Sequence, residues 1–110
     1  MTRTLTPAYS MPTVRKHAAP ITALTGITLE RLTSPGKRRP VVAARQELWA
    51  MLFLLEGWSS WKIRARFQVC HTTFLYHIRK WATRTLGTPP KATLAEIRTA
   101  WEAQQIEVAA

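Results

Sequence analysis

Residues 58–86, WSSWKIRARFQVCHTTFLYHIRKWATRTL, decide the fold. A serine that suits a helix N-cap opens a short amphipathic helix over residues 60–67. A tight connection at residues 68–70 then leads into a longer helix over residues 71–86, whose inner face carries aromatic and aliphatic side chains at helical spacing. A short helix, a three-residue turn and a longer helix predict a helix-turn-helix unit.

A second strong helix is expected just before this unit, over residues 41–56. Leu48, Leu52 and Leu55 follow one another at i, i+4 and i+7, so we expect them to form its buried stripe. Gly57 ends the helix, because glycine readily adopts the left-handed backbone that follows a last helical turn. Large aromatic side chains usually lie inside so small a fold, and the three expected core tryptophans are Trp49, Trp61 and Trp81.

The rest of the chain predicts weaker helical elements. Short helices are expected over residues 14–24 and 28–32, while Thr93 and Glu96 have the spacing of a capping box at the start of a last helix over residues 93–108. No segment has the alternating pattern of a strand. The predicted fold class is therefore all-α, a small helical bundle that contains a helix-turn-helix and has an additional C-terminal helix.

The pattern divides the chain into three segments. A flexible N-terminal arm is expected over residues 1–12, the helix-turn-helix domain over residues 13–87, and a proline linker with the C-terminal helix over residues 88–110. The last helix has a narrow apolar stripe that either docks on the body of the domain or forms the seam of a homodimer. The members of that stripe are Leu94, Ile97 and Trp101.

The charge balance indicates the kind of partner. The chain has 16 Lys and Arg against 6 acids, all of them Glu, for a net charge of +10, and the excess is concentrated between residues 31 and 84. Nucleic acid is the commonest partner of such a surface, so we expect double-stranded DNA; charge that serves only solubility is the alternative. A single cysteine, no apolar run long enough for a bilayer and no hydrophobic leader favour a cytoplasmic, nucleoid-associated bacterial protein without a membrane partner.

The second helix of a helix-turn-helix lies in the major groove, and its first two turns face the base edges. Imidazole and hydroxyl groups exchange hydrogen bonds with bases, and a threonine methyl packs on the methyl group of thymine. Helix capping by a histidine and a supporting role for the later positions are the alternatives. The candidates on this helix are His71, Thr72, Thr73, Tyr76, His77 and Lys80.

Five motifs occur in order along the chain: KRRPVVAARQ at 37–46, WSSWKI at 58–63, Phe67, HTT at 71–73 and RK at 79–80. Together they resemble the C-terminal DNA-binding domain of the bacterial chromosomal replication initiator DnaA, a Trp-repressor-like helix-turn-helix, over about residues 14–84. In that family the domain binds short duplex boxes. The resemblance implies that a basic loop reaches a minor groove, that an arginine touches phosphate or a groove edge, and that the HTT motif reads bases. In this chain the resemblance assigns Lys37, Arg38 and Arg39 to the basic loop and Arg45 to the arginine. The base-reading motif is His71, Thr72 and Thr73.

The chain also departs from the family pattern. Val69 and Cys70 stand where the family has an arginine and an acidic residue, and Arg64 replaces a small residue. No Gly-x-x-x-x-Gly-Lys-Ser/Thr sequence occurs, so the resemblance implies a relative without the ATPase module, of phage or mobile-element origin. We expect such a protein to act by occupying its site, and to prefer a target other than the family box.

An enzymatic function is not expected. The chain has no Asp, which excludes sites built on paired aspartates, and Cys70 and His71 are adjacent at a helix start and point apart. Cys70, His71 and His77 do not share a helix face that suits zinc. No catalytic residue, cofactor or metal site is therefore predicted.

The sequence thus favours a sequence-specific duplex-DNA-binding protein that regulates replication or transcription. A small DNA-packaging or partition subunit with the same module is the alternative, and a protein-binding adaptor is the second. The complete set of DNA-binding candidates adds two basic residues of the short helix: Lys37, Arg38, Arg39, Arg45, Lys62, Arg64, His71, Thr72, Thr73, Tyr76, His77 and Lys80.

Overall fold

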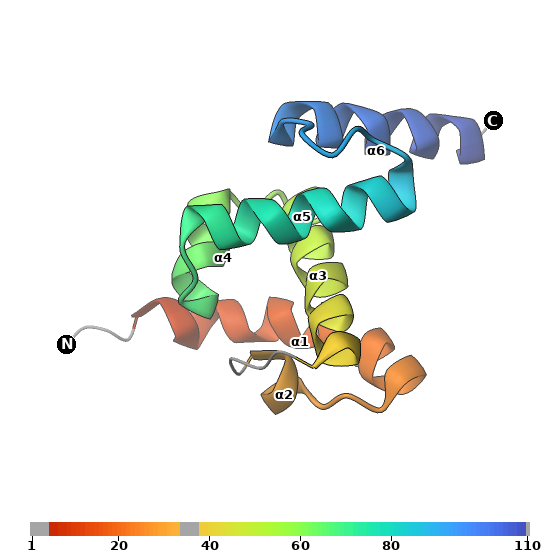
Figure 1. Ribbon diagram of the computed structural model, residues 1–110. Helices are drawn as coiled ribbons and strands as arrows, with labels where there is room; N and C mark the ends of the chain where they lie inside the picture. The colour runs from red at the N-terminus through yellow and green to blue at the C-terminus, as the bar shows by residue number, and fades with distance from the viewer. Residues whose placement is uncertain (1–4, 34–37, 110) are drawn as a thin grey trace.

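The computed structural model describes residues 5–33 and 38–109, and within them the side chains of residues 12–33 and 38–106. All regular structure in this part of the chain is helical (Figure 1). The helices are α1 (Leu5–Thr25), α2 (Leu29–Thr33), α3 (Arg39–Leu54), α4 (Ser60–Phe67), α5 (His71–Leu86) and α6 (Leu94–Ala109). The prediction of an all-α bundle with an additional C-terminal helix is confirmed.

α3 lies at the centre of the fold and packs against α1, α2, α4 and α5. Leu48 and Leu52 are fully buried, as their spacing predicts. Leu55, the third member of the expected stripe, is instead 52% exposed. The reason is that α3 ends at Leu54, so Leu55 lies at the helix cap and its side chain leaves the buried row.

The expected tryptophan core is correct at two of three positions. Trp49 and Trp81 are buried, but Trp61 is 69% exposed and Trp58 is buried in its place. Ser59 is the N-cap of α4, and Ile63 and Phe67 are its buried side chains. Trp61 precedes Ile63 by two residues, or about 200° around the helix, and therefore faces solvent.

α4 and α5 have the boundaries that the sequence predicts. Ser59 Oγ accepts a hydrogen bond of 3.1 Å from the Lys62 N–H at the start of α4. Gln68 ends α4 in the left-handed conformation, with φ 56°, and α5 begins three residues later with Cys70 as its N-cap. The polypeptide therefore turns sharply between the short helix and the long one, which sets the direction of α5.

α1 corrects the expected N-terminal arm. The flexible arm predicted over residues 1–12 is wrong for residues 5–12, because these residues belong to α1, which begins at Leu5. Residues 1–4 lie outside the described residues. The later part of α1 is fastened to the end of α3, since His17 Nε2 and Lys16 Nζ lie 2.6 and 3.2 Å from Glu56 Oε2. These two hydrogen bonds, His17 first, lower the pKa of Glu56.

α6 docks along α5, on the far side of α5 from α1 and α2 (Figure 1). The predicted capping box is present: Glu96 Oε1 accepts from the Thr93 N–H at 2.8 Å, and Thr93 Oγ1 accepts from the Glu96 N–H at 3.1 Å. Ile97 is fully buried, and Leu94 and Trp101 pack against the core. The stripe expected either to dock or to form a homodimer seam thus docks on the body of the same chain.

Candidate nucleic-acid interface

α5 has one buried and one open face. Its buried side chains are Phe74, Ile78, Trp81 and Ala82. The open face starts with His71 and Thr72, both exposed, and continues through Tyr76, which is 55% exposed, to Lys80. These four residues, together with Leu75, Arg79, Thr83 and Pro90, line a shallow hollow of about 540 Å³. Four of the predicted residues therefore share one accessible surface.

A second hollow, of about 480 Å³, lies between α3 and α5. Arg39 of α3 and Lys80 and Arg84 of α5 supply its positive charge, and none of its lining residues is acidic. Lys80 Nζ lies 5.7 Å from the ring centroid of Tyr76, so the two hollows meet at this pair of side chains. We call this second hollow, with Arg39, Lys80 and Arg84 at its walls, the basic groove. An anionic chain that lies in the basic groove is held by cations from both helices.

Gln46 forms the polar floor of the basic groove. Its side chain is only 5% exposed, yet both ends of the amide have partners. Arg84 Nη2 donates to Gln46 Oε1 at 3.1 Å, and Gln46 Nε2 lies 2.9 Å from His77 Nδ1. Because arginine can only donate, the amide oxygen must face Arg84 and the amide nitrogen must donate to His77.

His77 is therefore a supporting residue of the groove rather than an open contact. It is half-buried, and its ring meets Trp49 edge-on at 5.6 Å and Tyr76 at 5.2 Å. Burial, and then the charge of Arg45, lower the pKa of His77. The Nδ1 atom accepts a hydrogen bond, so the neutral ring carries its proton on Nε2.

Arg45 points to a different part of the molecule. Its Nε donates to the Leu32 carbonyl at 2.9 Å and its Nη2 to the Arg31 carbonyl at 3.3 Å. These carbonyls belong to the last turn of α2, where backbone acceptors lack helical partners. Burial lowers the pKa of Arg45. Arg45 thus fastens α2 to α3, and its predicted contact with phosphate or a groove edge stays a prediction.

The remaining predicted residues are spread around this surface. Arg38 is exposed at the N-cap of α3 but lines a separate groove on α1 and α3. Lys62 Nζ lies 4.3 Å above the Trp58 ring, and Arg64 is half-buried on α4; neither lines the two hollows on α5. Lys37 lies outside the described residues.

Cys70 and Thr73 interact at the start of α5. Cys70 is exposed, and its Sγ lies 3.2 Å from Thr73 Oγ1. The side-chain hydrogen bond of Thr73, followed by its backbone N–H, lowers the pKa of the Cys70 thiol. Thr73 is half-buried and engaged with the thiol, so His71 and Thr72 are the more accessible members of the HTT motif.

Three residues of this surface are absent from the predicted set. Arg79, Arg84 and Gln46 line or support the hollows. Arg84 follows Lys80 by four residues and Tyr76 by eight, a helical spacing that places all three on one face and was available in the sequence. The role of Gln46 had no such signal, because its partners are 31 and 38 residues away.

Among the described side chains, no group of three or more His, Cys, Asp or Glu residues is placed to hold a metal ion. No helix in the described part of the chain is long and apolar enough to cross a membrane. Comparisons of the chain with protein-family models, with curated proteins and with solved structures found no match.

Proposed function

We propose that this chain binds duplex DNA sequence-specifically, with α5 in the major groove. The observation that carries the proposal is the open face of α5, where His71, Thr72 and Tyr76 stand next to the basic groove between α3 and α5. An α-helix fits the width of the major groove of B-DNA, and hydrogen-bonding side chains on its first turns reach base edges.

The two hollows support different tasks in this complex. His71 and Thr72 precede Tyr76 by about one turn, so all three face the same stretch of base edges. Arg39, Lys80 and Arg84 surround a groove that follows the helix and suits a sugar-phosphate strand. Phosphate contacts fix the position of a protein on DNA, whereas base contacts select the sequence.

The buried amide of Gln46 supports the proposal indirectly. It holds Arg84 at one end and His77 at the other, and the His77 ring packs edge-on against Tyr76. A side chain that is held before binding loses less conformational entropy when its partner arrives. Gln46 and His77 are therefore assigned as positioning residues for a phosphate-binding arginine and a base-facing tyrosine.

The resemblance to the DnaA C-terminal domain supports a role in replication or transcription control by site occupancy. The helix-turn-helix assignment rests on α4, the turn at residues 68–70 and α5, whose boundaries match the motifs of that resemblance. Val69 and Cys70 remain the two departures next to the base-reading turn. Their weak hydrogen-bonding capacity supports a target that differs from the family box.

The test is a binding selection from random duplex DNA with the full chain, run in parallel with Thr72→Ala. We expect the wild-type chain to enrich a short motif and the variant to lose preference at one or two positions of it, since each base contact contributes about 1–3 kcal/mol. Binding without any enriched motif favours a packaging or partition subunit, and no binding at all favours a protein-binding adaptor. Either result overturns the proposal.

A further inference from the structure

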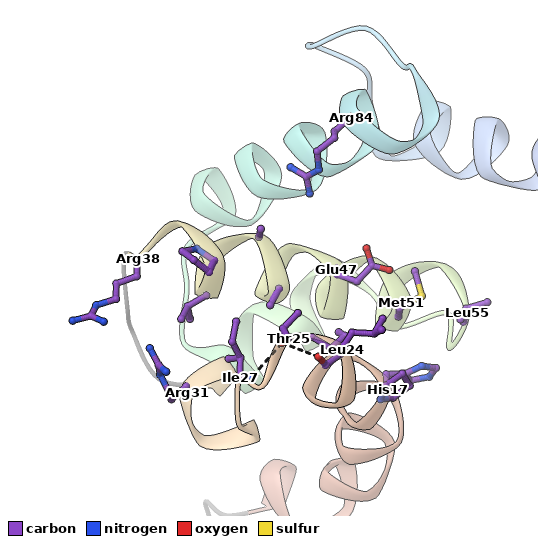
Figure 2. Close-up of a pocket in the computed structure, with 16 residues that line it drawn as sticks. His17, Leu24, Thr25, Ile27, Arg31, Arg38, Glu47, Met51, Leu55 and Arg84 are labelled. Carbon is purple, nitrogen blue, oxygen red and sulfur yellow. Dashed lines mark hydrogen bonds between the residues drawn. The ribbon is translucent and has the colours of Figure 1, made fainter.

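A longer groove on α3 borders the basic groove, with which it shares Ala43 and Arg84, but does not include the open face of α5. It has a volume of about 1030 Å³ and lies between the second half of α1 and α3 (Figure 2). Pro40, Ala44, Glu47, Met51 and Leu55 line it at spacings of three to four residues along α3. This spacing forms a row along one helix face, about four turns long, which suits a second helix laid beside it.

The groove combines exposed leucines with a cationic end. Leu55 is 52% exposed at one end and Leu24 is 88% exposed nearer the middle, while Arg31 and Arg38 lie at the other end and Arg84 lies above (Figure 2). Glu47 is the one acid among the lining residues, and its Oε1 already accepts from Trp81 Nε1 at 2.8 Å. Such a surface suits a helix that is apolar on one side and acidic beside it.

The chain itself contains a helical segment with one exposed large apolar side chain and with acids but no cations. Residues 101–110, which include the distal half of α6, carry two Glu and no Lys or Arg, although the chain as a whole has a net charge of +10. The side chains of residues 102–106 are all exposed, and Ile106 is 71% exposed. Glu102 lies one turn before Ile106 on the same helix face. Five large apolar side chains are well exposed among the described residues. Leu24 and Leu55 lie at the groove and Ile106 lies on α6, while the other two are Trp61 on α4 and Tyr76 on α5.

α6 cannot reach the groove of its own chain in this fold. Its first turns are fixed by buried Ile97, by Arg98 Nη2, which donates to the Phe53 carbonyl at 2.9 Å, and by Arg79, which holds Ala92. Figure 1 places α6 across α5 from α1, whose C-terminal half forms the groove wall. Within this fold α6 can therefore reach such a groove only on another molecule.

We infer that the groove between α1 and α3 binds the distal half of α6 from a second copy of the chain. Ile106 of one copy packs beside Leu24 and Leu55 of the other, and Glu102, one turn before Ile106, lies toward the arginines. Each copy carries one groove and one α6, so the contact is between unlike surfaces and either closes reciprocally into a dimer or continues from copy to copy. Binding of several copies along one DNA molecule is then cooperative.

The test measures the molecular mass of the full chain in solution, by sedimentation or light scattering, as its concentration rises from micromolar to millimolar. An ionic strength of about 0.15 M limits the mutual repulsion of these cationic chains to about 8 Å. We expect concentration-dependent association of the wild type. Leu24→Glu and Ile106→Glu each place a charge in the apolar contact, and each should weaken association by about tenfold or more.

A mixing experiment distinguishes this contact from any other. The Leu24→Glu chain keeps an intact α6, and the Ile106→Glu chain keeps an intact groove, so the mixture should form a one-to-one complex that neither variant forms alone. Trp61→Glu is the matched control, an exposed aromatic side chain away from both surfaces, and should associate like the wild type. Helical circular dichroism verifies that all variants are folded.

Three results overturn the inference. They are a wild-type chain that stays monomeric throughout, a mixture of the two variants that stays monomeric, and a Trp61→Glu chain that loses association as the other variants do. The proposed DNA binding is measured separately, because neither Leu24 nor Ile106 lies on the open face of α5. Failure of self-association therefore leaves that proposal standing.

Discussion

Nε2 of Gln46 lies 2.9 Å from Nδ1 of His77, and this hydrogen bond joins the buried side of α3 to the groove side of α5. The same amide accepts from Arg84, so one side chain connects the core to two residues of the candidate interface. A buried amide with partners at both ends is stabilising, whereas its loss leaves the partners to find water. The groove and the stability of the fold are therefore linked at this residue.

Gln46→Leu should destabilise the chain. Leucine has a similar volume but leaves half-buried His77 without its donor, at a cost of about 1–3 kcal/mol in the free energy of unfolding. Urea denaturation followed by circular dichroism measures this change. Gln104→Ala, an exposed glutamine on α6, is the control and should remain within about 0.5 kcal/mol of the wild type. A Gln46→Leu chain as stable as the wild type would contradict the role assigned to the amide.

The lowered pKa of His77 predicts how stability depends on pH. The folded state disfavours protonated His77, whereas the unfolded chain takes up this proton near an ordinary pKa of about 6.5. Stability from the neutral ring is thus present above that pH and is lost as the pH falls toward the lower folded-state pKa. Unfolding midpoints in urea, measured from pH 8 down to about pH 5, should decline below about 6.5.

His77→Gln should flatten this decline, because the group that titrates is gone. Gln104→Ala, the exposed glutamine on α6, is the control and should retain the wild-type slope. An unchanged pH dependence in the His77→Gln chain would contradict the role assigned to His77.

The sequence predicts those parts of the structure that depend on local signals. Residues 60–67 and 71–86 match α4 and α5 because an N-cap, apolar periodicity and terminal glycine act over a few residues. The errors arise where distant contacts decide. Trp61 is exposed because burial on the two-turn helix α4 depends on what packs against it. The hydrogen bonds of Arg45 to α2 had no local signal either, because the two carbonyls lie 13 and 14 residues away.

The same limit applies to the candidate site. Surface positions on α5 follow from helical spacing, so His71, Thr72, Tyr76 and Lys80 are found together as predicted. The basic groove needs α3 and α5 side by side, and helical periodicity within each segment carries no information on that pairing. The buried position of Gln46 and the half-buried position of His77 follow from the packing of α3 against α5.

Binding of duplex DNA should depend steeply on salt. If about five cations neutralise phosphates, the logarithm of affinity falls with the logarithm of salt concentration at a slope of about −4 to −5. Arg39→Ala and Lys80→Ala should each reduce the magnitude of this slope by about 0.9 and weaken binding to all sequences alike. Fluorescence anisotropy titrations at several salt concentrations measure both quantities.

Thr72→Ala should behave differently from these arginine and lysine variants. It should keep the salt slope and the affinity for random DNA, but lose about 1–3 kcal/mol on the selected site. Thr99→Ala on α6 is the control, because this exposed threonine is remote from α5's open face and should change neither quantity. Equal losses on selected and random DNA for Thr72→Ala would show that α5 does not read bases.

Cys70→Asp should change both stability and target preference. Cys70 is the N-cap of α5, where its thiol is a weak hydrogen-bond acceptor, whereas aspartate is a preferred N-cap that also complements the helix dipole. We expect a gain of about 0.5–2 kcal/mol in the free energy of unfolding.

An acidic residue at position 70 also restores an acceptor for a cytosine amine, which the family resemblance places just before the HTT motif. Binding to the family box should therefore rise by about tenfold relative to scrambled DNA. Val69 is left unchanged because its side chain packs against the core. Cys70→Ser is the control, since it caps the helix but carries no charge. Side-by-side titrations of the three chains on the box and on scrambled DNA decide the outcome: a wild-type chain that already prefers the box as strongly as Cys70→Asp refutes the argument that this position sets the target.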